Sequence, residues 1–362
     1  MKSILVLLIG DIKYDGRVQK EIRTLQQAGH HVTLVVSSFS KNDSLDNYDF
    51  NIIRLNNEYS TFAIGRIFST ILYYRQIHKI IKSVSPNIIH CNDLNTLLYI
   101  SGISKDIEVV YDAHELYLEG RHGVIKWFWS RIEKKLIYKT KAVIVPQIDR
   151  LYYMSFRYKL PIEHYHLVEN FPEKPHDLSK TYFKDKFGLN TDDKIVISYI
   201  GAITKERELI PLVESMLLID NAILVIIGRG NKEYELQLKR MIESNGLHEK
   251  VKVYSPIPHA EVLHAINSSD IGVCFYNDKN LNSYFCASNK LYEYLDLGVK
   301  VLTNYTAGAA HVIKNGENGF CCRTINKKTI AEGIKSLING KLSSKATYYW
   351  ENQVDTFLKI YE

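Results

Sequence analysis

Short apolar stretches alternate with longer amphipathic segments along most of the chain. The stretches are rich in Val, Ile and Leu, which is typical of strands buried on both faces of a parallel sheet. Between them lie segments of helical spacing: Val18, Ile22 and Leu25 share one face, and Gly29 follows at a C-cap position. This alternation predicts an α/β fold built from doubly wound parallel sheets. The predicted strands are 4–9, 31–37, 51–55, 87–90, 108–111 and 142–145 in the first half, and 194–200, 222–227, 251–254, 271–275 and 299–302 in the second.

The strand–helix pattern breaks at residues 171–176, where Pro172 and Pro175 stand in a polar setting. Two prolines so close together cannot sit inside a helix, so this segment is predicted to be an extended linker. A new strand–helix series begins near Lys194. The sequence therefore predicts two Rossmann-like domains, 1–170 and 177–340. Apolar residues at helical spacing in 346–362 predict a final helix, within 341–362, that packs across both domains.

Composition places the chain among ordinary globular proteins. Of its 362 residues 46% are hydrophobic and 24% are charged, which excludes disordered and fibrous classes. The net charge of +6 is too small to indicate a nucleic-acid partner. The apolar run Ile4–Ile9 is too short for a signal peptide, and no run reaches the roughly 18–20 residues that cross a bilayer. The five cysteines lack CxxC spacing, so reduced thiols and a cytoplasmic location are expected.

In such a fold, ligands bind where the strands end, and the first candidate site is the loop after the first strand. Gly16 stands directly before a helix, where a bare backbone can approach a phosphate or a sugar. The order of residues 10–17 is not GxGxxG, which argues against a dinucleotide-binding dehydrogenase. An ordinary strand–helix turn is the alternative interpretation.

A second candidate follows the strand 108–111, where Asp112, His114 and Glu115 are grouped. Three polar side chains at a strand end can reach a ligand, and an imidazole can donate to a developing oxyanion or a sugar hydroxyl. A lone histidine is more often structural, but its place between two acids favours function. At the end of the preceding strand, Asp93 is a candidate for binding an acceptor hydroxyl. The interpretation we favour for Asp93 is a cap of a helix starting near Asn95.

The third and fourth candidates lie in the second half. Gly201 opens a loop that ends in Lys205 and Arg207, and a guanidinium at that place suits a diphosphate, although a charged surface run is the alternative. Gly228 follows the next strand and is a weaker candidate for approach to a base or ribose. In the segment 288–298, Glu293 lies early in a predicted helix. Its carboxylate is suited to the two hydroxyls of a ribose, the alternative being an acid that stabilises the helix N-terminus.

Three segments, taken in order, resemble the retaining glycosyltransferases of family 4, the "glycosyl transferases group 1" type of bacterial capsule and O-antigen pathways. They are residues 15–21 with 29–32, residues 111–116, and residues 289–295. The resemblance covers nearly the whole chain. It implies a GT-B fold: an N-terminal acceptor domain, a C-terminal nucleotide-sugar domain, a cleft between them and a final helix that crosses back.

The resemblance also implies roles for single residues. Gly16 corresponds to the glycine loop that approaches the donor phosphate and the transferred sugar. His114 corresponds to the histidine beside the donor sugar, with Asp112 and Glu115 next to it. Arg207 stands where the family usually has a lysine that neutralises the diphosphate. Glu293 corresponds to the second glutamate of the E-x7-E motif, which holds the ribose. Asn289 and Lys290 are expected to contact the donor, and Lys290 is expected near a phosphate.

Two positions depart from the family pattern. Phe285 replaces the first glutamate of the E-x7-E motif, and Ala202 replaces the arginine that commonly follows the glycine. Arg207 and Lys205 are then left to meet the diphosphate charge. No Asp-x-Asp metal signature is present, so no cofactor or metal is expected. The expected reaction is retaining transfer from a UDP-sugar, with GDP second, to a surface-polysaccharide or lipid-linked glycan.

The segment 121–141 combines an apolar stripe with basic residues. Val124, Phe128, Ile132 and Leu136 repeat every four residues, with Trp127 and Trp129 nearby. The basic residues are Lys126, Arg131, Lys134, Lys135 and Lys139. Such a segment suits contact with an anionic membrane surface, although a crossover helix that buries its stripe against the sheet is slightly favoured.

Two other function classes stay open. A GT-B sugar-nucleotide 2-epimerase would need no acceptor and would consume the free UDP-sugar. A non-catalytic nucleotide-sugar-binding component of a polysaccharide assembly complex would tolerate the loss of His114. The missing first glutamate is the one feature that favours this second class.

Overall fold

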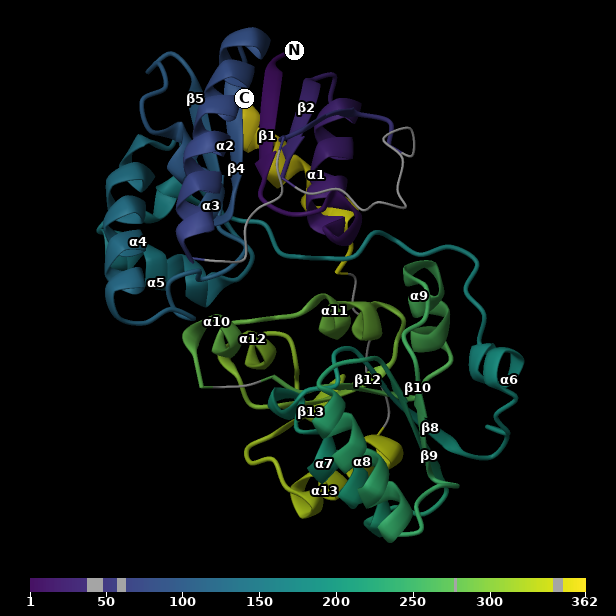
Figure 1. Cartoon of the computed structure of the whole chain (residues 1–362). Coiled ribbons are helices and arrows are strands. Elements are labelled where there is room, and N and C mark those ends of the chain that lie inside the picture. The colour runs from purple at the N-terminus through teal and green to yellow at the C-terminus, as the bar shows by residue number, and fades with distance from the viewer. Residues whose placement is uncertain (38–47, 57–62, 277–278, 341–347) are drawn as a thin grey trace. The chain divides into compact units, whose positions relative to one another are not determined.

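The computed structural model describes residues 1–37, 48–56, 63–276, 279–340 and 348–362 (Figure 1). The chain divides into two compact units. The first comprises Met1–Glu169 and Gln353–Glu362, and the second comprises Asn170–Asn352. Each unit is built around one parallel sheet, so the predicted α/β class and the doubly wound sheets are confirmed.

The first sheet has the strand order β3-β2-β1-β4-β5-β6-β7. Strand β1 pairs with β2 on one side and β4 on the other, so the direction of winding reverses between β1 and β4. In parallel sheets of this kind, ligands bind at the carboxyl ends of the strands, at the place where the winding reverses. The strands are β1 (Ser3–Leu8), β2 (His31–Val36), β3 (Asn51–Arg54), β4 (Ile88–Asn92), β5 (Glu108–Asp112), β6 (Ala142–Val145) and β7 (Tyr165–Leu167).

Helix α1 (Gly16–Gln27) follows β1. The Asp15 carboxylate caps it by accepting from the Val18 amide at 3.1 Å. Val18, Ile22 and Leu25 are fully buried, as their spacing predicts. The other helices of this unit are α2 (Ala63–Val84), α3 (Asp93–Leu97), α4 (Gly123–Leu136), α5 (Ile148–Tyr158) and α14 (Val354–Leu358).

The second sheet has the order β10-β9-β8-β11-β12-β13 and reverses its winding between β8 and β11. A separate apolar core covers each face, one with α7, α8 and α13 and the other with α6, α9 and α11 (Figure 1). The strands are β8 (Ile195–Ile200), β9 (Ala222–Ile227), β10 (Val251–Tyr254), β11 (Ile271–Cys274), β12 (Lys300–Asn304) and β13 (Gly319–Cys322). The helices are α6 (Tyr182–Phe187), α7 (Leu209–Ser215), α8 (Lys232–Ser244), α9 (His259–Asn267), α10 (Leu281–Tyr284), α11 (Asn289–Asp296), α12 (Ala307–Ala310) and α13 (Lys327–Asn339).

A strand lies at each predicted position, with ends shifted by at most two residues. Two edge strands, β7 and β13, were missed. The segment 171–176 forms neither helix nor strand, as its prolines predict. The predicted final helix is instead a series of short turns: a 3₁₀ turn at Trp350–Gln353, α14, and a 3₁₀ turn at Lys359–Tyr361. Residues 341–347 lie outside the described part of the chain.

Helix α4 differs from the favoured prediction. Leu136 is buried, but Val124 is 80% exposed and Phe128 51% exposed, so the helix does not bury its stripe against the sheet. Its inner face instead carries Glu133, which accepts hydrogen bonds from Tyr111 and Tyr158. No helix among the described residues is long and apolar enough to span a bilayer.

Candidate functional site

In the first unit, the candidate residues meet where β4 and β5 end. Asn92 of β4 lies beside Asp112 of β5 in the sheet register. The Asp112 side chain is fully buried, and its Oδ2 lies 2.9 Å from Nε2 of His114 in the loop that follows. The strand thus fixes the carboxylate, and the carboxylate orients the imidazole.

Arg17 of α1 binds the same carboxylate. Its Nη2 donates to Asp112 Oδ2 at 3.2 Å, and its Nη1 donates to the Val168 carbonyl at 2.9 Å. The guanidinium is 5% exposed, so this ion pair is buried. Arg17 was not predicted as a site residue. A charged residue next to the buried position Val18 on the inner helix face is the signal that could have found it.

These contacts set the charges at the end of β5. Burial alone would raise the pKa of Asp112, but Arg17 and His114 hold it well below its usual range. Burial alone would lower the pKa of His114, but the Asp112 carboxylate raises it to about 9. At neutral pH, His114 is therefore an imidazolium that can donate from both ring nitrogens.

His90 of β4 adds a neutral imidazole to this group, since burial lowers its pKa to about 4. The Asn92 amide nitrogen donates to the Leu7 carbonyl, which leaves the Asn92 oxygen to accept from His90 Nε2 at 3.2 Å. His90 Nδ1 then accepts from the hydroxyl of Tyr361 at 2.5 Å. This hydrogen bond joins the 3₁₀ turn Lys359–Tyr361 to β4, next to the candidate site.

Asp93 does not cap a helix, so that favoured interpretation is wrong. Asn92 occupies the N-cap position of α3, and Asp93 is the first helical residue with a φ of +62°. Its carboxylate accepts from the Glu115 amide at 3.1 Å instead. Burial is the main reason that the pKa of Asp93 rises to about 6. The Glu115 side chain is exposed to solvent, whereas His114, in the same loop, is only partly exposed.

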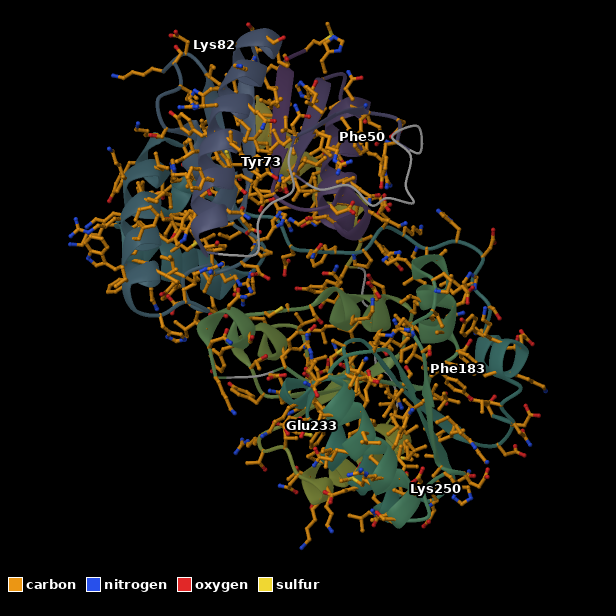
Figure 2. The ribbon with its side chains drawn as sticks, viewed as in Figure 1. Phe50, Tyr73, Lys82, Phe183, Glu233 and Lys250 are labelled. Atoms are coloured by element: carbon orange, nitrogen blue, oxygen red, sulfur yellow. The ribbon has the colours of Figure 1, made fainter. Side chains whose placement is uncertain are left out.

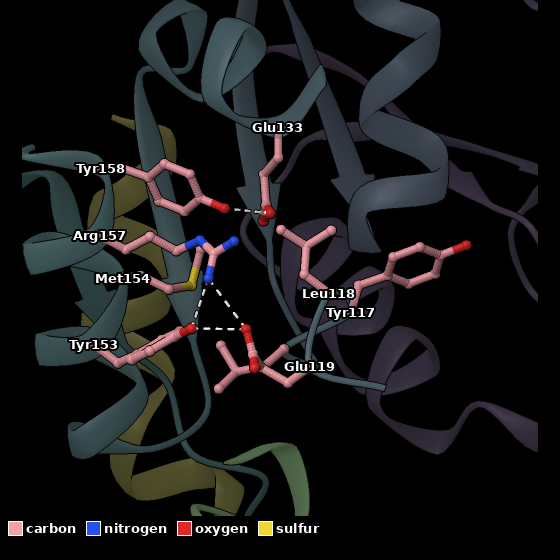
Figure 3. Close-up of a pocket in the computed structure, with 9 residues that line it drawn as sticks. Tyr117, Leu118, Glu119, Glu133, Tyr153, Met154, Arg157 and Tyr158 are labelled. Carbon is pink, nitrogen blue, oxygen red and sulfur yellow. Dashed lines mark hydrogen bonds and ion pairs between the residues drawn. The ribbon is translucent and has the colours of Figure 1, made fainter. Parts of the chain in front are cut away.

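A small pocket lies beside this loop, between Glu119 and helix α5 (Figure 3). Arg157 Nη1 donates to Glu119 at 3.1 Å and lies 2.7 Å from the Tyr153 hydroxyl, so both polar groups are already engaged. The pocket volume is about 10 Å³, room for one water molecule and too little for a sugar. It supports the loop rather than a ligand.

In the second unit, the candidates meet at the point where the sheet reverses its winding. Lys205–Arg207 forms a 3₁₀ turn in the loop after β8. Arg207 Nη1 donates to the Phe275 carbonyl, directly after β11, at 3.1 Å, and its guanidinium stacks 4.0 Å above the ring centre of Tyr276. The Lys205 side chain is exposed.

Helix α11 brings Lys290 and Glu293 to the same strand end. The Ser288 hydroxyl caps this helix, Asn289 is exposed at its first position, and Lys290 Nζ lies 2.6 Å from Glu293 Oε2. Burial raises the pKa of the Cys274 thiol at the end of β11 to about 12, while Lys290 and Arg207 act to lower it. Both cations are therefore close to one strand end, although they are far apart in the sequence.

The glycine loops after β8 and β9 pack against each other. The Gly201 amide donates to the Ile227 carbonyl at 3.0 Å, and the Ile203 amide donates to the Arg229 carbonyl at 3.1 Å. A Cβ on Gly228 would lie 1.8 Å from the Gly201 carbonyl oxygen. This close approach explains Gly228 without a ligand. Gly16, in contrast, faces open space, since a Cβ there meets nothing within 4 Å.

Gly228→Ala is therefore expected to lower the free energy of unfolding by about 1–3 kcal/mol, because the two loops must separate to admit a methyl group. Gly16→Ala is the matched control. It adds a methyl group in open space at the start of α1 and should leave stability equal or slightly raised. Urea denaturation of both variants checks this. Equal midpoints for Gly228→Ala and the wild type would contradict the packing argument.

Comparison with known families identifies the architecture. A family model described as "Glycosyltransferase Family 4" matches residues 17–171, and one described as "Glycosyl transferases group 1" matches residues 179–353. The chain belongs to the group 1, family 4 glycosyltransferases. The two matched ranges correspond to the two structural units, and the fold is of the GT-B type.

Individual relatives of this glycosyltransferase are distant. The capsular polysaccharide biosynthesis glycosyltransferase CapM of Staphylococcus aureus is 25% identical over 167 residues, which are 45% of this chain and 41% of that protein. The match thus spans less than half of the curated relative. The solved structure of Anabaena HepE in complex with UDP-glucose matches with a TM-score of 0.75 at 13% identity, over 99% of both chains. A putative UDP-N-acetylglucosamine 2-epimerase from Listeria monocytogenes matches with a TM-score of 0.68 at 12% identity, over 97% of this chain and 93% of that one.

Proposed function

We propose that this glycosyltransferase moves a hexose-type sugar from a nucleoside-diphosphate donor, UDP before GDP, to a surface-polysaccharide or lipid-linked glycan. The observation that carries the proposal is the convergence of Arg207, Lys290 and Glu293 on the carboxyl end of β11. Two cations and one carboxylate are the groups that a diphosphate and a ribose require. Family membership and the likeness to HepE, solved with UDP-glucose, support the same donor class.

In this proposal, the second unit binds the donor. Arg207, with Lys205 beside it, meets the diphosphate, and Glu293 accepts from the ribose hydroxyls. Lys290 bridges the two parts, since its ammonium already pairs with Glu293 and has further donors for a phosphate oxygen. Gly201 and Gly228 shape the loops around the donor. Ala202 leaves the diphosphate with one cation fewer than the family usually offers, and Phe285 leaves the transferred sugar without its usual carboxylate.

The first unit supplies the group that stabilises the reacting sugar. As the bond between the sugar C1 and the diphosphate oxygen breaks, negative charge develops on the leaving oxygen and positive charge on the sugar ring. The acceptor oxygen then bonds to C1 on the same face, and its proton passes to the leaving diphosphate. The His114 imidazolium, held by Asp112, donates a hydrogen bond to the donor sugar with Glu115 next to it, while Asp93 is assigned to the acceptor.

No step of this reaction needs a metal, because side-chain cations neutralise the diphosphate. The absence of an Asp-x-Asp sequence supports a metal-independent mechanism. The test is release of UDP from a panel of UDP- and GDP-sugars in EDTA, with and without a lipid-linked glycan acceptor. Acceptor-dependent release in EDTA, with the anomeric configuration retained, is the expected result.

Two outcomes of that assay would favour another function. Consumption of UDP-sugar with no acceptor present would favour an epimerase. This class is considered because the putative epimerase from Listeria has a similar fold. Donor binding with no release under any condition would favour a non-catalytic sugar-nucleotide-binding component. Release that EDTA abolishes would contradict the metal-independent mechanism.

We also propose that the first unit rests on an anionic membrane at the cytoplasmic face. On α4, Val124, Ile125, Trp127 and Phe128 are all more than half exposed. Helix α5 lies next to α4 (Figure 1), and its Phe156 is 89% exposed. Lys134 and Lys135 continue the exposed face of α4. Apolar anchors next to lysines fit a bilayer of anionic lipid, where an acceptor with a lipid tail would reside.

Trp127→Ser with Phe128→Ser is expected to reduce co-sedimentation with phosphatidylcholine vesicles that contain phosphatidylglycerol by about tenfold, because both rings leave the bilayer interface. Lys134→Glu with Lys135→Glu should reduce it by about thirtyfold or more, at about 1 kcal/mol for each lysine removed. Leu217→Ser with Leu218→Ser, also exposed but in the second unit, is the matched control and should have no effect. Equal binding to purely zwitterionic vesicles, or unaffected α4 variants, would contradict a membrane-facing α4.

A further inference from the structure

Beneath His114 lies a buried carboxyl group that the proposed reaction does not use. Glu21 of α1 is 2% exposed, and its Oε1 lies 2.9 Å from Nε of Arg17. The ligand atoms of Glu21, His90 and Asp112 all lie within 4.8 Å of one another. Two carboxyl groups thus share one guanidinium in a region closed to water.

The hydrogen bonds in this group are unevenly divided. Arg17 donates to both Asp112 oxygens and to the Val168 carbonyl. Neither Glu21 oxygen accepts a hydrogen bond of good geometry from the part of the chain that the structure describes. The Nε2–H of His90, 3.5 Å from Glu21, is directed to Asn92. An ionised Glu21 would share its one close cation, Arg17, with the carboxylate of Asp112, and two buried carboxylates beside a single guanidinium are disfavoured.

We propose that Glu21 and Asp112 share one proton in the folded protein, and that Glu21 is a positioning residue that acts through Asp112 on His114. The proton resides mainly on Glu21, because Arg17 and His114 both lie against Asp112. The Glu21 carboxyl group then donates to Asp112 and holds it under His114. This role in catalysis rests on the proposed function, but the shared proton does not.

The surrounding charges agree with this assignment. Burial, and then the charge of Asp112, raise the pKa of Glu21 well above its usual range, while Arg17 and His114 oppose the rise. The facing groups are Arg17 and Asp15 on or before α1, His90 on β4, Asp112 on β5, His114 after it, and the Tyr361 hydroxyl from the tail. With Glu21 and His90 neutral, the two cations Arg17 and His114 both lie against one carboxylate, Asp112.

A metal ion is the competing occupant, since two carboxylates and an imidazole can form a ligand set. Two observations favour the proton. Arg17 already places a positive charge against both carboxyl groups, and His90 Nε2 carries the hydrogen that it donates to Asn92, so that nitrogen has no lone pair for a metal.

The sign of the pH dependence follows from the shared proton. The unfolded chain releases the Glu21 proton above about pH 4.3, whereas the folded protein retains it. For each pH unit above pH 5, the unfolding equilibrium constant of the wild type should therefore rise about tenfold relative to that of Glu21→Gln. The wild type thus loses stability, relative to Glu21→Gln, as the pH rises. Glutamine reproduces the neutral carboxyl group and has no proton to lose.

The experiment is urea denaturation from pH 5 to pH 8 of the wild type, Glu21→Gln and Glu21→Ala. Glu108→Gln, which removes an exposed carboxylate of the same unit, is the control and should follow the wild-type pH dependence. A gap between Glu21→Gln and the wild type that widens with pH supports the proposal. A constant deficit of Glu21→Gln at every pH, its failure to fold, or one equivalent of bound metal that Glu21→Gln loses would overturn it.

The catalytic readout separates positioning from simple packing. Glu21→Gln should keep the transfer rate within about threefold of the wild type and leave its pH profile unchanged, whereas Glu21→Ala should lose more than tenfold. A tenfold loss in Glu21→Gln with wild-type stability would overturn the positioning role. If no variant, nor the wild type, transfers sugar, the proposed function fails, and the denaturation series still decides whether the proton is shared.

Discussion

Replacing His114 with alanine is expected to lower the turnover of sugar transfer by about 10²–10³-fold, the cost of removing one preorganised donor to a developing charge. The Kd of the donor should change by less than about threefold, because the charged donor-binding groups lie in the loop after β8 and on α11 of the other unit. Single-turnover kinetics together with calorimetric donor binding separate the two effects. His122→Ala, at an exposed histidine eight residues further on, is the matched control and should behave as the wild type.

The same histidine predicts the alkaline limb of the pH profile. Because Asp112 raises the pKa of His114 to about 9, the imidazolium is present at neutral pH and is lost as the pH rises through 9. Turnover should therefore stay level between pH 7 and 8 and fall above about pH 9. A fall centred near pH 6.5, or an unchanged turnover in His114→Ala, would contradict the assignment of a charged His114 to the reacting sugar.

Glu293→Ala is expected to weaken donor binding by about 10–100-fold, since hydrogen bonds to a charged group contribute about 1.5–3 kcal/mol. The variant also leaves the Lys290 ammonium without its partner at 2.6 Å. Isothermal calorimetry with UDP and with UMP separates the two effects, because both ligands carry the ribose and only UDP carries the second phosphate.

Two further variants make the interpretation of Glu293 specific. Lys290→Met should weaken UDP more than UMP, since the ammonium is assigned to a phosphate. Glu243→Ala, at an exposed glutamate on α8, is the matched control and should bind UDP like the wild type. If Glu293→Ala bound UDP with wild-type affinity and folded normally, the ribose role would be wrong, and Glu293 would be a partner of Lys290 alone.

The sequence predicts most of this architecture, and the misses have physical reasons. Strands such as β1 and β9 are easily recognised in the sequence, because both faces are buried and every position is apolar except Ser3 at the start of β1. The edge strand β7 carries His166 within three residues, and β13 begins with a glycine and ends in two cysteines, so neither shows that pattern. Edge strands have one pairing partner and need less apolar surface.

The candidate site was predictable to a different extent in the two units. Asp112 and His114 stand together in the sequence, so one strand end reveals them. Arg17, Glu21 and His90 could not be placed there from spacing alone, because α1 and β4 meet Asp112 of β5 only in the folded unit. Likewise the contact of Arg207 with the strand end near Lys290 depends on β8 and β11 being neighbours in the sheet.

Helix α4 shows why a periodic pattern does not reveal which face is buried. Its apolar stripe fits the spacing of a core helix, yet Val124 and Phe128 are exposed. The inner face is occupied by Glu133, which Tyr111 and Tyr158 satisfy with hydrogen bonds. A buried carboxyl with two phenol donors looks like an exposed acid in the sequence, because its partners come from other elements.

The most direct test of the central claim is the binding of UDP, GDP and CMP to the full chain by calorimetry in the presence of EDTA. The account predicts saturable binding of UDP that persists in EDTA, weaker binding of GDP, and none of CMP. UDP should bind about 10–100-fold more weakly to Glu293→Ala. The absence of binding by any nucleotide, or UDP binding that EDTA removes, would contradict a metal-independent nucleotide-sugar site on the second unit.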